Sequence, residues 1–150
     1  MREIASLEAL RGLVGADVAV TDWMEITQQR VNSFADATDD HQWIHVDPER
    51  CRRESPFGGP IAHGFLTLSL LPAMLERSVH LSFPRMIINY GVNKVRFPAP
   101  VPVGSRVRGI LHLQSLEDVE QGAQLVWRVT IEDEAETKPV CVAELVIRLL

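Results

Sequence analysis

Residues 61–78, IAHGFLTLSLLPAMLERS, constrain the fold more than any other segment of the sequence. The segment is apolar almost all round from Ile61 to Leu75, it is too long for one strand, and it lacks the alternation of a strand. A helix that is apolar on every face is a buried helix, so we expect residues 61–78 to form a central one. Pro72 is expected to kink this helix or to mark its last turns.

Four β-rich segments follow the apolar segment: residues 85–97, 105–118, 123–133 and 139–150. The second and third alternate apolar and polar residues, whereas the last is apolar on both faces, as a central strand would be. Turns are predicted at residues 119–122 and 134–139, and a break in the first strand at Gly91. An early strand within residues 16–26 is expected to join this antiparallel sheet.

Two helices are predicted before the apolar segment. Residues 25–40 are predicted to form the first, with Thr27 as its N-cap. Four residues of this segment fall on one stripe at helical spacing: Val31, Phe34, Ala35 and Thr38. Asp47 followed by Pro48 is a good cap and first turn for a short second helix, which ends before a loop at residues 55–60. This order of elements predicts one α+β domain in which an antiparallel sheet wraps around the apolar helix.

Composition and charge exclude several classes of protein. The net charge of −5, without a long basic block, argues against nucleic acid as the main partner. No apolar run reaches the roughly 18 residues that a membrane helix needs. The N-terminal segment does not resemble a signal peptide, so we expect a cytoplasmic protein with Cys51 and Cys141 as reduced thiols. Because one sheet covers only one side of the apolar helix, we expect a dimer.

The stretch DATDDHQWIHVDPER, residues 36–50, carries the first candidate site. Asp40 and His45 lie five residues apart across a predicted helix end. A carboxylate and an imidazole can hold one water between them and move its protons, which is general acid–base chemistry. The alternative is a helix-terminal aspartate followed by a capping histidine.

The stretch GGPIAHGF, residues 58–65, is the second candidate. Its glycines lead into the start of the apolar helix, where N–H groups are unpaired, and the N–H of Gly64 can face a carbonyl oxygen that gains negative charge. The alternative is a glycine loop that only makes a tight turn. His63 is expected to be a satisfied polar residue beside this loop. Arg96, within a predicted strand, is expected to support a loop, the alternative being contact with a phosphate.

Taken together, these segments resemble the MaoC-like dehydratases, the hot-dog-fold (R)-specific enoyl-CoA hydratases, and especially the branch that contains nodulation protein N. The family signature reads Gly-Asp-x-Asn-Pro-apolar-His followed by Val/Ile-Asp, and residues 39–47 here read DDHQWIHVD. Asp40 and His45 match the family's catalytic pair, and Gly64 matches its oxyanion-hole glycine. Gln42 replaces the asparagine and Trp43 the proline, a pair typical of the branch. The third departure, Asp39, replaces the usual glycine and adds a charge beside Asp40.

The resemblance implies a single hot-dog domain over residues 1–150 and a hydro-lyase that reversibly hydrates trans-2-enoyl thioesters to (R)-3-hydroxyacyl thioesters. Asp40 and His45 would move the protons of the water, and Gly64, with His63 beside it, would receive the thioester oxygen. The expected partners are acyl-CoA or an acyl-carrier-protein thioester and a second copy of the chain, with no cofactor and no metal ion. The open alternatives are a hot-dog acyl-CoA thioesterase and a non-catalytic acyl-thioester-binding subunit.

One further expectation concerns the two large apolar residues between the candidate catalytic groups. Trp43 and Ile44 would anchor the loop in the core, so that Asp40 and His45 face a narrow tunnel.

Overall fold

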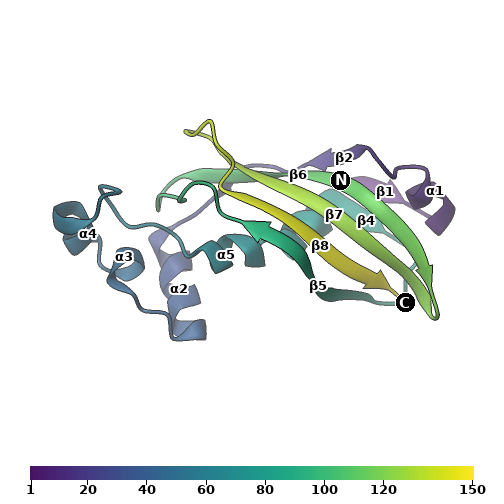
Figure 1. Cartoon of the computed structure of the whole chain (residues 1–150), viewed down its shortest axis with the longest axis horizontal. Coiled ribbons are helices and arrows are strands. Elements are labelled where there is room, and N and C mark those ends of the chain that lie inside the picture. The colour runs from purple at the N-terminus through teal and green to yellow at the C-terminus, as the bar shows by residue number, and fades with distance from the viewer.

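A six-stranded antiparallel sheet forms most of the protein, which is described by a computed structural model over residues 1–150 (Figure 1). The strands run in the order β2-β6-β7-β8-β5, and β3 also pairs with β6. Their bounds are Asp17–Val20 for β2, Met24–Glu25 for β3, Ile87–Arg96 for β5, Arg106–Val119 for β6, Gly122–Asp133 for β7 and Cys141–Leu149 for β8. The four predicted late strands and the early strand are therefore confirmed, although the early one is divided in two.

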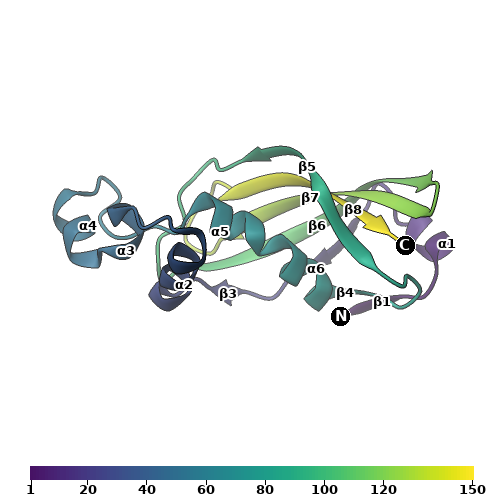
Figure 2. The same cartoon turned by 90° about the horizontal axis from the view of Figure 1, so that it is seen from below.

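Two consecutive helices, α5 (Gly64–Ser69) and α6 (Leu71–Ser78), cross one face of the sheet (Figure 2). Buried side chains from both helices and from β6, β7 and β8 belong to one core of 26 buried residues. Gly109 on β6 leaves room for this packing, since a Cβ there would lie only 3.2 Å from the sulfur of Met74 on α6.

The prediction of one buried helix over residues 61–78, with a kink or its last turns at Pro72, was wrong in two respects. Ile61 lies in an isolated β-bridge with Pro102, and Leu70 separates the two helices. Pro72 occupies the first turn of α6, where a residue without an N–H is tolerated. The helical segment is also not buried on every face, because Phe65 is 68% exposed in the single chain.

The N-terminal segment adds a small second sheet that the sequence patterns did not predict. β1 (Arg2–Ile4) pairs in parallel with β4 (Val79–Leu81), and the short helix α1 (Leu7–Arg11) follows β1. Ile4 and Leu10 are buried, so this segment closes the core beyond the C-terminal end of α6.

Strand β5 forms one free edge of the sheet, since it pairs only with β8. The strand continues through Gly91 without the predicted break, although its register with β8 shifts between Asn89 and Gly91. Large apolar side chains on or beside β5 are exposed, at fractions between 37% and 57%: Met86, Ile87, Ile88, Tyr90, Val92 and Phe97. An exposed apolar edge of this length is characteristic of a surface that pairs with another chain.

Three helices lie beyond one end of the sheet (Figure 1). They are α2 (Gln28–Thr38), α3 (Trp43–Val46) and α4 (Pro48–Glu54). The predicted caps are confirmed, since the Thr27 and Asp47 side chains accept hydrogen bonds from the N–H groups of the first turns of α2 and α4. Of the predicted stripe on α2, Val31 and Ala35 are buried and Phe34 is half-buried, but Thr38 is exposed.

Both cysteines are buried free thiols, as expected from the sequence. Burial raises the pKa of the Cys141 thiol to about 11, so this thiol is protonated at neutral pH. None of the helices combines the length and the hydropathy that crossing a membrane requires.

Candidate active site

A reversal of the chain after α2 brings the first candidate residue into place. Asp39 ends α2 in the left-handed conformation, with φ 61° and ψ 16°, and no other non-glycine residue in the chain has a positive φ. This conformation explains why glycine suits the position, since side chains other than those of Asn and Asp rarely adopt it. Asp40 follows this turn, and α3 then begins at Trp43.

His45 on α3 is 6% exposed and is fixed by a short hydrogen bond. Its Nδ1 lies 2.6 Å from the carbonyl oxygen of Ile61, and the N–H of Ile61 donates in turn to the carbonyl of Ile44 at 3.0 Å. A carbonyl can only accept, so Nδ1 carries the proton and Nε2 presents its lone pair. Burial lowers the pKa of His45 below its ordinary value of 6.5, although the bond to Ile61 opposes this shift, so the ring is neutral at pH 7.

His63 lies inside this cluster, not merely beside the glycine loop as the sequence suggested. It is 3% exposed, its ring stacks on His45 with 3.9 Å between centroids, and its Nε2 lies 2.9 Å from the carbonyl oxygen of Asp40. The ring of Phe34 packs on it at a centroid distance of 4.9 Å. Only one of the two ring nitrogens is satisfied, because the buried Nδ1 has no hydrogen-bond partner.

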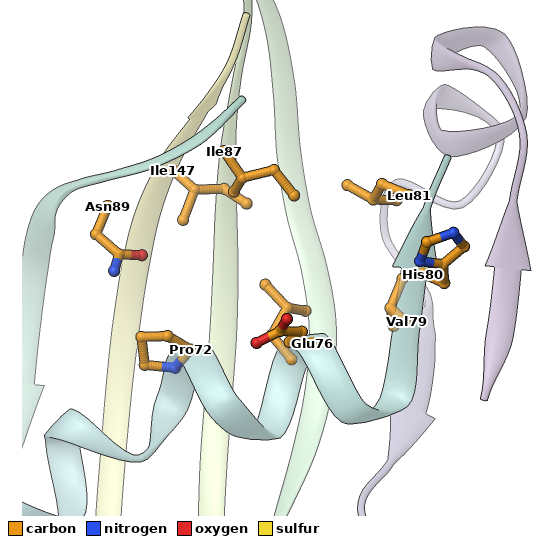
Figure 3. A pocket seen from close by; sticks show the side chains of 9 residues that line it. Pro72, Glu76, Val79, His80, Leu81, Ile87, Asn89 and Ile147 are labelled. Carbon is orange, nitrogen blue, oxygen red and sulfur yellow. The ribbon is translucent and has the colours of Figure 1, made fainter. Parts of the chain in front are cut away.

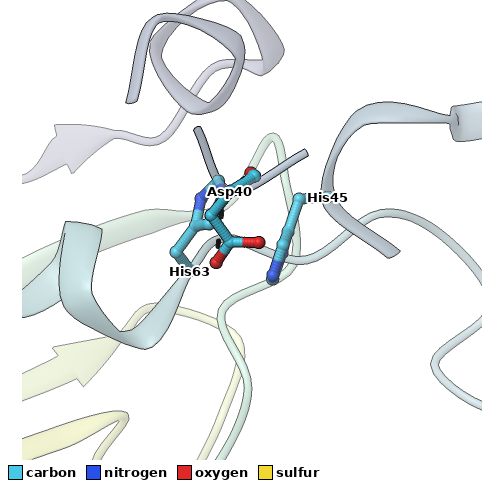
Figure 4. A group of neighbouring side chains, drawn as sticks. All are labelled: Asp40, His45 and His63. Carbon is cyan, nitrogen blue, oxygen red and sulfur yellow. Dashed lines mark hydrogen bonds and ion pairs between the residues drawn. The ribbon is translucent and has the colours of Figure 1, made fainter. Parts of the chain in front are cut away.

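The carboxylate of Asp40 lies with the two imidazoles (Figure 4). Ligand atoms from Asp40, His45 and His63 all lie within 4.8 Å of one another, and the Asp40 side chain is 53% exposed. Three such groups can also hold a metal ion, but Nε2 of His63 donates its proton to a carbonyl and does not present a lone pair to the cluster. We therefore interpret the cluster as a site for a small molecule such as water.

A cavity of about 330 Å³ connects His45 with Gly64. Its lining is mostly apolar and includes Phe57, Thr67 and Phe97. A Cβ on Gly64 would lie 3.0 Å from the ring of Phe97, so a larger residue would displace that wall of the cavity. Gly64 is the first residue of α5, where backbone N–H groups have no partner within the helix.

The expectation that Trp43 and Ile44 anchor the loop in the core was wrong. Both are half-buried, and the guanidinium of Arg50 stacks over the indole of Trp43, with its Cζ 4.2 Å from the ring centroid. The buried residue of this turn is His45 itself, because the four residues of α3 turn its ring inward against His63.

Two other supporting residues had no signal in the sequence. The Gln28 side chain on α2 donates to the carbonyl of His45 at 2.8 Å. The thiol of Cys51 on α4 lies 3.3 Å and 3.4 Å from the carbonyl oxygens of Trp43 and Ile44, against the far side of α3. Arg96 is exposed and donates to the carbonyl of Val95.

A second cavity, of about 410 Å³, contains none of the predicted site residues (Figure 3). It lies between α6, β4, the first half of β5 and the end of β8, and is lined by Pro72, Leu75, Glu76, Val79, His80, Leu81, Ile87, Asn89 and Ile147.

The sequence also matches a family model described as "MaoC like domain", over residues 10–135. The chain belongs to the MaoC-like family. It is 52% identical to 3-hydroxyacyl-thioester dehydratase Z of Mycobacterium tuberculosis, over 99% of this chain and 98% of that protein. It is 47% identical to Nodulation protein N of Rhizobium meliloti, over 95% of this chain and 89% of that protein.

Among solved structures, the (R)-hydratase of A. caviae involved in PHA biosynthesis matches with a TM-score of 0.74 and 24% identity, over 91% of this MaoC-like chain and 96% of that one. The family resemblance and the hot-dog fold expected from the sequence are therefore confirmed.

The left-handed conformation of Asp39 yields a prediction about stability. Asp39→Gly is expected to raise the free energy of unfolding by about 0.5–1 kcal/mol, because glycine adopts this conformation without the steric cost that a side chain brings. Ala37→Gly, two residues earlier and within α2, serves as the control and is expected to lower it by up to about 1 kcal/mol. Urea unfolding of both variants provides the measurement. A destabilised Asp39→Gly protein would show that the aspartate is held there by interactions of its side chain.

Proposed function

We propose that this chain catalyses the reversible, (R)-specific hydration of trans-2-enoyl thioesters, with the reverse reaction dehydrating 3-hydroxyacyl thioesters. The observation that carries the proposal is the pairing of the Asp40 carboxylate with a neutral His45 whose Nε2 is free, next to a cavity that contains Gly64. The expected hydro-lyase class is confirmed by the family and by relatives that are named dehydratases.

The proposed mechanism begins with one water held by two acceptors, the Asp40 carboxylate and Nε2 of His45. As the water oxygen bonds to C3 of the enoyl group, the pair takes one proton from it. The electrons of the C2–C3 double bond move toward the thioester oxygen, where the N–H of Gly64 stabilises the enolate-like charge. Return of a proton to C2 completes the hydration, so that one water is added and nothing is oxidised or reduced.

The two alternatives make different demands on the site. A thioesterase needs a carboxylate aimed at the carbonyl carbon, whereas Asp40 is grouped with His45 and His63. A non-catalytic binding subunit needs no free nitrogen on His45. Assays for thioester hydrolysis and for binding without turnover separate these functions from hydration.

Acyl thioesters are thus the substrate class. We propose that the acyl group is carried by CoA or by acyl-carrier protein, and that the chain is a single domain over residues 1–150 located in the cytoplasm.

The proposed active unit is a homodimer formed through β5. The strand is an unpaired sheet edge that exposes apolar side chains. Phe97, which directly follows β5, is also exposed, and its ring lies next to the exposed ring of Phe65 on α5. Both β5 and the α5–α6 segment run between the catalytic cavity and the cavity of Figure 3. A two-fold axis through the middle of β5 places the first half of β5 in one subunit beside the second half of β5 in its partner. The second cavity of each subunit then lies toward the proposed catalytic cluster of the other subunit.

The catalytic assignment predicts selective loss of turnover. Asp40→Asn and His45→Gln are each expected to lower kcat/KM for the hydration of crotonyl-CoA by about 10²–10⁴-fold, the usual contribution of a general acid or base. His41→Gln is the matched control, since His41 lies on the same turn but is exposed and pairs with Asp36. Loss of enoyl absorbance follows the reaction, and circular dichroism checks the fold. Near-wild-type turnover in both variants would remove the pair from the mechanism.

The dimer predicts that only one edge of the sheet is sensitive to charge. Val92→Lys on β5 is expected to give a monomer, because an edge lysine opposes strand pairing. Val20→Lys on β2, the opposite edge, changes a valine that is 55% exposed, compared with 46% for Val92, and is expected to leave the dimer intact. Light scattering at micromolar concentration should give twice the chain mass of 16.8 kDa for the wild type and the control. A wild-type monomer with full activity would contradict the proposal.

A further inference from the structure

We propose that His63 is a positioning residue that fixes both catalytic groups at once, through a hydrogen bond to the backbone of Asp40 and through ring stacking on His45. This role rests on the proposed function and goes beyond it, because His63 itself need not touch the substrate. Three helices meet at this ring: α2 through Phe34, α3 through His45, and α5, for which His63 is the N-cap residue.

The first part of the role concerns Asp40, which is otherwise weakly held. Its side chain is half exposed, and the only hydrogen bond to its carboxylate comes from the N–H of Gln42 at 3.4 Å. The residue before it, Asp39, is in the left-handed conformation. The 2.9 Å bond from Nε2–H of His63 to the carbonyl oxygen therefore holds the main chain of Asp40, and the same nitrogen lies 4.0 Å from Oδ2 of its carboxylate.

The second part concerns the ring of His45. The hydrogen bond from Nδ1 to Ile61 fixes one edge of this ring, but a ring held at one atom can still rotate about that bond. The ring of His63 lies flat against it, with an interplanar angle of 26°, and is itself backed by Phe34. The stack thus confines the plane of His45 and aims Nε2 at the position shared with Asp40.

The unpartnered Nδ1 of His63 agrees with a fixed tautomer. Nε2 donates to a carbonyl, so it carries the proton, and a second proton on the buried Nδ1 would have no acceptor. The stack on His45 requires a flat ring, and the bond to the Asp40 carbonyl requires an N–H donor at the far edge of that ring. Phenylalanine lacks the donor and glutamine lacks the ring. This explains why a buried histidine lies beside a histidine that acts on the substrate.

Two amide substitutions separate a positioning role from simple packing. The amide nitrogen of His63→Gln reaches about as far as Nε2 and can keep the bond to Asp40, whereas that of His63→Asn is one methylene short. His63 makes no side-chain capping bond to α5, and asparagine is a favourable N-cap residue, so the start of α5 is not expected to be weakened. His112→Gln on β6 is the control, because it also replaces an imidazole bonded to an oxygen, that of Asp17 at 2.8 Å.

For crotonyl-CoA hydration, kcat of His63→Asn is expected to fall about 10-fold to 100-fold, as for a slight misplacement of a catalytic group. His63→Gln is expected to keep kcat at least about fivefold above that of the asparagine variant, because it retains the hydrogen bond but loses the stack. KM is expected to stay within about twofold in both, since binding contacts are unchanged.

The pH dependence adds a readout that packing alone would not change. Burial is the main cause that lowers the pKa of His45, and the neighbouring imidazole of His63 adds to the lowering, whereas the bond to the Ile61 carbonyl and the charge of Asp40 raise it. Without the second imidazole, the pKa of His45 should rise, so the acid limb of kcat/KM should move to higher pH in both variants but not in His112→Gln. NMR titration of His45 measures the same shift without any need for activity.

Equal kcat values in the glutamine and asparagine variants would overturn the hydrogen-bond part of the proposal. An unchanged acid limb and an unchanged His45 titration would overturn the stacking part. Wild-type protein is measured in the same assay, so the absence of hydration there refutes the proposed function, whereas the titration still tests the contact of His63 with His45.

Discussion

A pair of hydrogen bonds between α3 and the segment before α5 holds the whole site together. The N–H of Ile61 donates to the carbonyl of Ile44, and Nδ1–H of His45 donates to the carbonyl of Ile61. The segment is tied to the sheet in turn, because Ala62 N–H donates to Val101 and Val103 N–H donates to Pro60. The catalytic turn is thus joined through main-chain bonds to a loop that leads into β6, and the same contact that anchors His45 also selects its tautomer.

Burial has opposite consequences for the two members of the proposed catalytic pair. His45 is nearly inaccessible and is kept neutral by its surroundings, whereas Asp40 is half exposed on the last turn before α3. One group therefore supplies a free nitrogen in an apolar cavity, and the other supplies negative charge at its margin. In the proposed mechanism, this asymmetry lets the pair accept hydrogen bonds from both O–H groups of one water and take one proton from it, and it depends on contacts from three separate helices.

Local patterns predicted those features that depend on near neighbours in the sequence. Thr27 and Asp47 were recognisable as caps, and the alternation in β6 and β7 set their registers, since a shift of one residue would expose their apolar faces. The Asp40–His45 spacing and the glycine before α5 marked the site because both carry chemistry in short motifs. The end of α2 was also predictable, because the family signature has a glycine at the position of Asp39 and glycine suits a tight helix end. Asp39 adopts the left-handed conformation there.

Other features depend on contacts between distant segments and had no local signal. His63 looked like a satisfied loop residue, and its bond to Asp40 exists only once α2 and α5 are packed. The break at Leu70 was hidden because Pro72 fits either the end of one helix or the first turn of the next. Trp43 looked like a core anchor from its size, but the turn of α3 directs His45 inward in its place.

The most direct test of the central claim follows the atoms of the reaction. Incubation of crotonyl-CoA with the protein in deuterium oxide is expected to give the (R)-3-hydroxyacyl thioester with one deuterium at C2, because the pair that activates the water also returns a proton to that carbon. Mass spectrometry counts the deuterium, and chiral analysis gives the configuration at C3. Formation of the (S) product, or release of free CoA without a hydrated thioester, would contradict the account.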